Sequence, residues 1–327
     1  MRARELISEF ELISKYFKKL TNRAVLGVGD DAAILRLCPD SEIAATTDTL
    51  VEGVHFFSDC DPFLLGRKVL AVNFSDLAAM GARPHSVLLS LSLRECDESW
   101  LASFSDGFHR MLEEFQVELV GGDTTRADQL VISVTALGDV DIGSALRRDR
   151  AQVGDDVWVS GELGLATLAL ASRDNSVVYP RELLDDCNKR LNNPEPRVAL
   201  GRRLIGVANC AIDISDGLVA DAGHISTQSE VGIELILDQI PTHRTLIQLG
   251  LPQNDLVSLI SGGDDYELLF TCSRSRENDI GTLSRELKIP ITKIGAVVEG
   301  RGVILKDRFG KIVEVDRPGY EHFSRRT

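Results

Sequence analysis

Aspartates recur beside glycines and hydroxyl residues along this chain. Five such places are VGDDAAI (28–34), TTDT (46–49), GGDTT (121–125), DISDG (213–217) and GGDD (262–265). Taken singly, each motif is typical of a turn, because an Asp side chain can hydrogen-bond its own backbone. Carboxylates with hydroxyl and carbonyl neighbours are also the hard oxygen ligands that Mg2+ prefers. The repetition therefore raises the hypothesis that these acids converge around divalent cations.

Asp76 carries separate information, because it lies inside a helical apolar pattern, four residues after Val72 and three before Ala79. A carboxylate directed at a core is costly unless it is paired or binds a cation. Asp76 therefore either belongs to a cation cluster or marks a cleft where the helix contacts water. The pattern leaves both interpretations open.

A converged carboxylate cluster would predict a polyphosphate substrate. Carboxylates within about 4 Å of one another raise each other's pKa unless cations hold them together. Mg2+ in such a cluster neutralises phosphoryl oxygens during group transfer. The chain has no GxxxxGK[ST] motif, and Gly27-x-Gly29 is followed by two aspartates instead of a dinucleotide fingerprint. Arg147 or Arg148 is a candidate for direct contact with a phosphate, although both also fit a solvated linker face.

Two further residues are candidates for substrate contact. His55 follows an apolar stretch and precedes two phenylalanines, a setting that fits a packed or surface imidazole as well as a functional one. Tyr320 lies in the aromatic cluster GYEHF (319–323), near a chain end, where residues are usually polar. That cluster either closes the core or forms a wall on which a flat heterocycle stacks.

These residues need strands and helices to position them. Short apolar or β-branched runs predict strands at 42–47, 117–120, 130–137, 157–159, 211–214, 233–237, 268–271 and 303–305. Helical spacing predicts helices at 62–80, 100–115, 196–205 and 218–229, and an amphipathic first helix with Leu6, Phe10, Ile13, Phe17 and Leu20 on one face. Asp31, Asp48, Asp123 and Asp213 then stand at or near strand ends, where scaffolds present functional groups.

The length of 327 residues favours two domains. A polar connector, SALRRDRAQVGDD (144–156), makes a plausible boundary, and we expect domains at 1–148 and 149–327. Strands mixed with long helices indicate an α/β or α+β fold.

Composition excludes several classes of function. The formal net charge of -14 argues against nucleic-acid binding through a basic surface. No apolar run approaches the length of a membrane span, and MRARELISEF lacks the apolar core of a secretory signal. The six cysteines form no C-x-x-C pair, which favours reduced thiols and a cytoplasmic location.

Seven motifs follow one another along nearly the whole chain: VGDDAAI, TTDTLVEGVHF, KVLAVNFSDLAAMGARP, LVGGDTTR, AIDISDGL, SGGDDYELLF and GYEHF. In this order they resemble the thiamine-monophosphate kinase family. VNFSDLAAMGARP, GGDTT and ISDGL indicate the wider superfamily with the aminoimidazole ribonucleotide synthetase (PurM-like) fold. TTDTLVEGVHF and GYEHF narrow the resemblance to the kinases.

The resemblance implies a two-domain fold: an N-terminal α/β domain with a mixed sheet that pairs with a second subunit in a homodimer, and a C-terminal α+β domain. ATP and several Mg2+ ions would lie near the dimer interface. The implied metal ligands are Asp31, Thr46, Thr47, Asp48, Asp76, Asp123, Asp213 and Asp216. The implied ATP contacts are Gly122, Asp123, Arg148 and Ser215, and the implied substrate contacts are His55, Asp264 and Tyr320. The match favours Asp31 over Asp30, and Asp264 stands where the family often has Glu.

The implied reaction moves the γ-phosphoryl group of ATP directly onto thiamine monophosphate, giving thiamine diphosphate. The acceptor is already an anionic oxygen, so positioning and charge neutralisation would replace a general base. The alternatives are a sister enzyme and a non-catalytic cation-binding protein. A selenophosphate-type sister needs a reactive residue in an N-terminal Gly-rich loop, and a hydrogenase-maturation type needs a C-terminal Cys; the first Cys here is Cys38, and the chain ends in RRT.

Overall fold

The computed structural model describes residues 9–19, 21, 24–29, 31–36, 38–173 and 179–323. Leu6 and Leu20 of the predicted first helix, and Asp30, lie outside these residues. The chain forms two compact units: Met1–Leu77 with Ala82–Gly143 is unit 1, and Ala78–Gly81 with Ser144–Thr327 is unit 2. The predicted boundary at 148/149 falls five residues after the division between Gly143 and Ser144.

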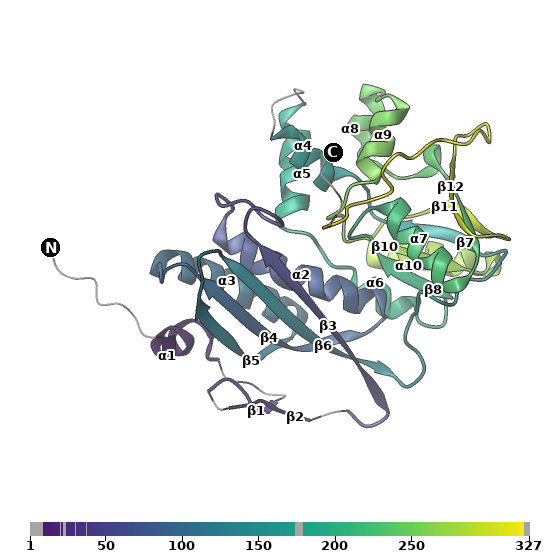
Figure 1. The fold of residues 1–327 in the computed structure, drawn as a ribbon. Coiled ribbons are helices and arrows are strands. Elements are labelled where there is room, and N and C mark those ends of the chain that lie inside the picture. Colours follow the sequence, from purple (N-terminus) through teal and green to yellow (C-terminus); the bar gives the residue numbers. More distant parts are fainter. Residues whose placement is uncertain are drawn as a thin grey trace. The chain divides into compact units, whose positions relative to one another are not determined.

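Unit 1 is built on a four-stranded sheet whose strand order is β3-β6-β4-β5. The strands are β3 (Ser41–Val51), β4 (Arg83–Leu93), β5 (Glu118–Arg126) and β6 (Val131–Asp141). β6 pairs antiparallel with β3 and β4, whereas β4 and β5 are parallel, so the sheet is mixed. Two helices, α2 (Pro62–Ala79) and α3 (Glu98–Phe115), cover one face of this sheet (Figure 1).

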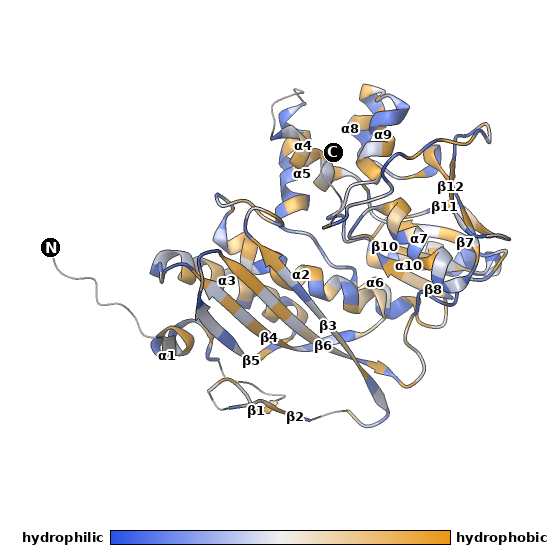
Figure 2. Ribbon diagram, viewed as in Figure 1, coloured by the Kyte–Doolittle hydropathy of each residue, from blue (hydrophilic) through white to orange (hydrophobic). Residues whose placement is uncertain are grey.

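Alternation along the strands separates the two faces of this sheet. In β6, Ile132, Val134 and Ala136 are fully buried, whereas the intervening Ser133 and Thr135 are half-buried. Successive side chains of a strand point to opposite faces, so the apolar residues pack under the helices and the hydroxyl residues line the second face. No described helix of unit 1 covers this second face, which we call the open face (Figure 2).

The helices α2 and α3 cross at two glycines. A Cβ atom added to Gly66 would lie 2.2 Å from the carbonyl oxygen of Phe104, and one added to Gly107 would lie 1.9 Å from that of Phe63. Real Cβ atoms do not approach so closely, and only glycine permits this contact between backbones. Asp97 begins α3 as its N-cap, and its side chain accepts hydrogen bonds from the backbone amides of Ser99 and Trp100.

The prediction for α2 is correct in extent but wrong in pattern. The sequence predicted one apolar stripe, whereas residues 68–79 are buried on every side of the helix except at Asp76. Asp76 is half-buried and is therefore the exception in an otherwise enclosed helix.

The described N-terminal segment is short and irregular. α1 (Glu9–Leu12) continues into a π-helical turn, η1 (Ile13–Phe17), and both Leu12 and Phe17 are buried. The carbonyl oxygen of Tyr16 contacts α3, accepting a hydrogen bond from Ser105 Oγ at 2.6 Å. Two strands that the sequence did not predict, β1 (Ala24–Leu26) and β2 (Ile34–Leu35), pair antiparallel.

Unit 2 contains a six-stranded sheet in the order β12-β9-β11-β7-β10-β8. Its strands are β7 (Asp156–Ser160), β8 (Cys210–Asp213), β9 (Gly232–Ile236), β10 (Leu268–Cys272), β11 (Ile291–Val298) and β12 (Gly302–Lys306). Only the pair β12 and β9 is parallel. The main core gathers alternate residues of these strands, such as Val157, Ile212 and Ile233, with Leu218 and Ile225 of the helix α7.

The helices of unit 2 are partly those that the sequence predicted. They are α4 (Leu165–Ser172), α5 (Arg181–Asn192), α6 (Val198–Leu204), α7 (Leu218–Ser229), α8 (Arg244–Leu249), α9 (Gln253–Ile260) and α10 (Glu277–Leu287), with the short 3-10 turns η2 (Leu237–Gln239) and η3 (Arg274–Arg276). The predictions of α6 and α7 are confirmed, and the other helices of this unit were not predicted.

The mixed sheets and flanking helices of both units confirm an α/β (α+β) fold. Within the described residues, no helix combines the length and the apolar character needed to cross a membrane. All six cysteines are free thiols, and three of them, Cys187, Cys210 and Cys272, are buried.

Candidate active site

Three candidate ligands of unit 1 meet on the helix-covered face of its sheet. Thr46 and Asp48 are two residues apart in β3 and so point to the same face. Thr46 Oγ1 donates a hydrogen bond to Asp76 Oδ2 of α2. Burial and, to a smaller extent, the charge of the nearby Asp76 together raise the pKa of Asp48 to about 7. Two carboxylates and a hydroxyl thus come together from a strand and a helix.

This group suits a divalent cation. Desolvation and like charge both disfavour the ionised form of Asp48, and a bound cation would reverse both effects. Carboxylate and hydroxyl oxygens are the donor set that Mg2+ prefers. The side chains of Thr46, Asp48 and Asp76 therefore fit Mg2+.

Thr47 lies on the other side of β3. Its hydroxyl donates a hydrogen bond to the carbonyl oxygen of Val134 at 3.1 Å and accepts one from Thr135 Oγ1 at 3.1 Å. The structure therefore does not bring the Thr47 side chain to Asp48 and Asp76.

Asp123 also lies away from that group. Cross-strand pairing puts Asp123 in one row with Ser90, Ser133 and Thr49 on the open face, whereas Asp48 shares a row with Val134 on the helix-covered face. β3 and β5 are the two edges of the sheet, and three strand spacings separate them by about 14 Å. Asp123 and its neighbour Gly122 are exposed, so they can reach a ligand, but not together with Asp48 of the same sheet.

The expectation that the acids stand at strand ends is correct only in part. Asp213 is the last residue of β8. Asp48 and Asp123 instead lie inside β3 and β5, because these strands continue past the residues where the sequence predicted their ends. Both strands continue through hydroxyl residues that lie on the open face. A prediction from hydrophobicity alone assigns such residues to a loop. Asp31 is exposed in the bend that precedes β2.

His55 is held in the turn that follows β3. Its Nδ1 accepts a hydrogen bond from the backbone amide of Val51 at 3.0 Å, so the neutral ring carries its proton on Nε2. The backbone amide of His55 donates to the carbonyl oxygen of Val51 at 2.9 Å. Lys68 of α2, which is buried, lies with its Nζ 3.5 Å from the carbonyl oxygen of His55. Sequence reasoning missed Lys68, which looks like an ordinary polar residue of the helix.

In unit 2, two loops and the C-terminal segment join around the end of β8. The backbone amide of Asp264 donates to the carbonyl oxygen of Ser215 at 2.9 Å, and that of Tyr320 donates to the carbonyl oxygen of Asp216 at 2.9 Å. Asp213 precedes these residues and is buried. The structure therefore brings together the five candidates Asp213, Ser215, Asp216, Asp264 and Tyr320.

Asp221 of α7 organises this region, and sequence reasoning missed it. Its Oδ2 accepts hydrogen bonds from the backbone amides of Ser215, Asp216 and Gly217, each at 3.1 Å. Burial raises the pKa of Asp221 to about 7, although these three bonds act in the opposite direction. The signal was available, because an acid in the first turn of a helix can bind the free amides before it.

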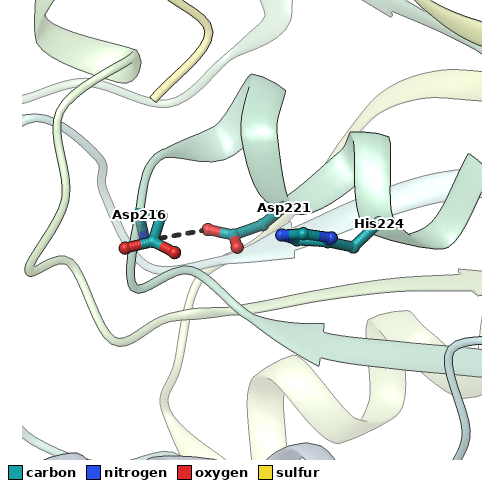
Figure 3. Close-up of side chains that lie close together, drawn as sticks. All are labelled: Asp216, Asp221 and His224. Carbon is teal, nitrogen blue, oxygen red and sulfur yellow. Dashed lines mark hydrogen bonds between the residues drawn. The ribbon is translucent and has the colours of Figure 1, made fainter. Parts of the chain in front are cut away.

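One group of potential metal ligands lies at the beginning of α7 (Figure 3). It comprises Asp216 of the preceding loop with Asp221 and His224 of the helix, and their potential ligand atoms all lie within 4.8 Å of one another. Asp216 was predicted to hold a further ion, whereas His224 was not singled out. The two carboxylates suit Mg2+, and the imidazole is a less usual ligand for that ion.

Asp264 lies in a constrained loop. It adopts φ of 69° and Tyr266 adopts φ of 50°, both in a region that favours glycine. Tyr266 Oη donates a hydrogen bond to Asp264 Oδ1 at 2.8 Å. Such backbone strain persists only where the surroundings enforce it, and it often marks functional sites.

The two arginines of the connector differ in their contacts. Arg147 pairs with Asp149, with Nε and Oδ1 2.9 Å apart. The backbone of Arg148 is fixed at the beginning of β8, because its carbonyl oxygen accepts hydrogen bonds from Ser229 Oγ and Cys210 Sγ. The Arg148 backbone therefore contacts Cys210, the first residue of β8, whereas Asp213 is the last residue of that strand. The backbone of Arg148 does not join the group around Ser215.

Two family profiles match the chain. Residues 29–140 match the AIR synthase related protein, N-terminal domain, and residues 152–308 match the AIR synthase related protein, C-terminal domain. The chain is 40% identical to the thiamine-monophosphate kinase of Escherichia coli (strain K12), over 97% of this chain and 98% of that protein. It is 35% identical to the thiamine-monophosphate kinase of Aquifex aeolicus (strain VF5), over 99% of this chain and 100% of that protein.

Solved structures give the same similarity. Thiamine-monophosphate kinase from Stenotrophomonas maltophilia K279a superposes with a TM-score of 0.82 and 43% identity, covering 89% of this chain and 93% of that one. AaThiL complexed with AMPPCP and TMP superposes with a TM-score of 0.77 and 34% identity, covering 99% of both chains. The hydrogenase maturation protein HypE of E. coli, at 22% identity and a TM-score of 0.76, shares the fold.

Proposed function

This chain belongs to the thiamine-monophosphate kinase family of AIR synthase related proteins, and from that premise we propose that it transfers the γ-phosphoryl group of ATP to thiamine monophosphate, giving thiamine diphosphate. It is an ATP-dependent thiamine-phosphate kinase. The observation that carries the proposal is the 40% identity to a thiamine-monophosphate kinase over 97% of this chain. The similar AaThiL chain complexed with AMPPCP and TMP supports both substrates.

We assign several Mg2+ ions to the reaction; when bound, they would neutralise the charge of phosphate oxygens. In unit 1 the carboxylates of Asp48 and Asp76 and the hydroxyl of Thr46 would hold one ion, and their mutual proximity supports this assignment. Asp31 and Thr47 remain further candidate ligands. Asp123 lies on the open face and follows the exposed Gly122, so we assign both residues to a different part of the bound ATP.

In unit 2 we assign Asp213 and Asp216 to metal binding and Ser215 to ATP. The loop that carries them is fixed by Asp221, which orients three successive amides without touching a substrate itself. Arg148 is assigned to the ATP phosphates. Arg147 is the weaker candidate, because its guanidinium already pairs with Asp149.

His55, Asp264 and Tyr320 are assigned to thiamine monophosphate. The neutral His55 ring offers an Nε2–H donor, because Nδ1 accepts from the backbone. Tyr320 exposes 51% of its surface, which leaves the ring open for stacking against a flat heterocycle. The Asp264 carboxylate, held by Tyr266, can pair with a cationic ring.

The transfer we propose is direct and in line. The acceptor phosphate oxygen is already an anion, so the chain's residues need to align two anions and not to remove a proton.

We propose that residues 1–148 bind ATP and Mg2+ and form a homodimer, and that residues 149–327 complete the nucleotide and substrate site. A cytoplasmic location, without membrane or nucleic-acid partners, accords with the six free thiols and the charge of -14.

The decisive experiment incubates the purified chain with ATP, Mg2+ and thiamine monophosphate and separates the thiamine species by chromatography. We expect thiamine diphosphate and ADP to form in equal amounts, and no phosphorylated protein to be trapped during turnover. ADP release without thiamine diphosphate would reject the kinase assignment, and a trapped phosphoenzyme would reject direct transfer.

A further inference from the structure

Unit 2 contains a cavity that none of the residues assigned to the kinase reaction lines. Its volume is about 420 Å3, within the usual range for small-molecule sites. It lies over β7, β11, β9 and β12, with Asp156, Glu234, Lys293 and Lys306 among its lining residues. β8, which presents Asp213, is three strands from β11 in the sheet order, a separation of about 14 Å.

The cavity occupies the sheet face that the main core leaves free. Ile233 and Leu235 of β9 belong to that core, whereas Glu234 and Ile236 point the other way and line the cavity. The strand between the charged residues, β11, contributes Ala296, which pairs with Asp156 on one side and with Glu234 on the other. Gly295 precedes it, so the floor of the cavity carries almost no side chain.

The acidic groups of the cavity are already neutralised. Asp156, which is 1% exposed, lies 2.7 Å from Lys293 Nζ and 3.4 Å from Arg274 Nε. Glu234 pairs with Lys306 at 2.6 Å. One buried carboxylate therefore faces two cations, which leaves positive charge in excess on that side.

The remaining two acids bind backbone amides, and Asp238 also pairs with the Arg308 side chain. Asp307 Oδ1 accepts hydrogen bonds from the amides of Phe309 and Lys311, each at 2.9 Å. Asp238 Oδ2 accepts from the amide of Arg308 at 2.9 Å. These carboxylates fix the turn at one rim of the cavity, and the amide hydrogen bonds stabilise their negative charge.

Two guanidinium groups remain weakly engaged at the rim. Arg274 and Arg308 are each 70% exposed, and their closest ion-pair distances, 3.4 Å and 3.8 Å, are the longest in the cavity. Loose, exposed pairs of this kind contribute little stability, so the arginines can turn to another anion at low cost. A guanidinium presents paired donors that match the oxygens of a phosphate or carboxylate.

We propose that this cavity is a second binding site of the chain, separate from the kinase residues, for a small oxyanion ligand of the phosphate class. Arg274 and Arg308 hold its phosphate, with Lys293 and Lys306 behind them. The body of the ligand lies over Gly295 and Ala296.

The test is calorimetric titration of the full chain with pyrophosphate in the presence of EDTA. Removing Mg2+ leaves the aspartates assigned to the kinase reaction as repelling carboxylates, so binding there is suppressed. We expect saturable binding, weakened about tenfold by each of Arg274→Gln and Arg308→Gln, since each removes one charge-assisted contact. Arg301→Gln is the matched control, because Arg301 is similarly exposed, at 75%, and pairs with Glu230 away from the cavity lining; the affinity of this variant should equal that of wild type.

A second readout places the ligand. Trp158 pairs across the sheet with Lys293, and Trp100 is the only other tryptophan of the chain. In a Trp100→Phe background, pyrophosphate should change the emission of Trp158 with the same affinity that calorimetry gives. Citrate, titrated in parallel, distinguishes a phosphate ligand from a carboxylate ligand. Weaker binding of citrate than of pyrophosphate supports the phosphate class, and tighter binding of citrate overturns it.

The outcomes that overturn the site are an absence of saturable binding, equal binding by the Arg274→Gln/Arg308→Gln double variant, or binding without a change in Trp158 emission. The initial rate of kinase turnover of the double variant should match that of wild type, because neither arginine is assigned to the kinase reaction. Because the calorimetric and fluorescence titrations use no thiamine compound, their outcome is independent of the kinase assignment.

Discussion

At the scale of single residues, Asp48 and Asp76 are two acids assigned to Mg2+ whose charges interact. The structure places them together although one comes from a strand and the other from a helix. Asp76 was ambiguous in the sequence, because a core carboxylate and a cleft carboxylate produce the same pattern. Its hydrogen bond from Thr46 and its effect on Asp48 favour the cation-binding interpretation.

The Asp48 carboxyl should make Mg2+ binding depend on pH. With its pKa raised to about 7, Asp48 is mostly protonated at pH 6 and mostly ionised at pH 8. A proton and Mg2+ compete for the same oxygens, so Mg2+ affinity should rise roughly tenfold between these values. Mg2+ titrations of turnover at both pH values measure this, and equal Mg2+ requirements would contradict it.

The same shift has a consequence for stability without Mg2+. The folded pKa lies above the unfolded value, so the folded chain binds more protons and loses stability as pH rises from about 4 through 7. In EDTA, Asp48→Asn should therefore raise the melting temperature more at pH 8 than at pH 5. An effect of equal size at both values would show that Asp48 does not titrate in this range.

Asp123 is expected to act on turnover alone. It is exposed on β5, so Asp123→Asn removes a charge without opening the core. We expect kcat to fall by about two orders of magnitude or more, as for loss of a major electrostatic group, with an unchanged melting temperature. Near-normal turnover would remove Asp123 from the set assigned to metal and ATP.

Tyr266 should affect substrate binding through Asp264. Tyr266→Phe removes the 2.8 Å hydrogen bond to Oδ1 while keeping the ring. One such bond contributes about 1 kcal/mol, so KM for thiamine monophosphate should rise about fivefold, with kcat and KM for ATP nearly unchanged. If KM for both substrates rose together, the loop would have a general structural role instead.

At the scale of elements, the contact between α2 and α3 is the most demanding packing in unit 1. Gly107→Ala would place a methyl group 1.9 Å from the Phe63 carbonyl oxygen, and the helices must separate to admit it. We expect a loss of about 3 kcal/mol in the free energy of unfolding, measured by urea denaturation. Gly281→Ala in α10 is the control, because nothing lies within 4 Å of its added Cβ, and it should stabilise slightly. Equal effects of the two changes would contradict the proposed crossing.

Sequence reasoning found most elements whose apolar period is regular. It predicted α2, α3 and α7 closely, but it missed β4 and β11. β4 contains Pro84 near its start and Ser90 and Ser92 within it, so half of its residues read as a loop. β11 carries Gly295 at a register shift, which hides the alternation. The contacts that make these segments strands are long-range and do not appear in the local pattern.

The same limit applies to the candidate site. Motifs located Asp213, Ser215, Asp216 and Asp264, and backbone hydrogen bonds join their loops. The separation of Asp123 from Asp48 could not be predicted, because it depends on strand order and register. Asp221 was missed because the motifs were searched for ligands of a substrate or metal, whereas this acid in the first turn of α7 holds a loop.

At the scale of the whole molecule, the open face of the sheet in unit 1 supports the proposed homodimer. Ile43 is 44% exposed there, and Leu88 and Leu137 are half-buried among hydroxyl residues. Leu88→Glu should convert a dimer into a monomer in sedimentation experiments, because a charge buried between two sheets is costly. A substitution on the exposed side of α10, Arg285→Glu, should leave the sedimentation unchanged. A wild-type chain that sediments as a monomer would reject the dimer.

The alternation of β3 has a final consequence for how its gene can change. Side chains alternate between the two faces of a strand. Deleting one residue of β3 upstream of Thr46 would therefore turn Asp48 to the open face and Thr47 toward α2. Deleting two would restore the orientation of every side chain. Natural length variation within this strand should therefore come in even numbers, even where single substitutions are tolerated.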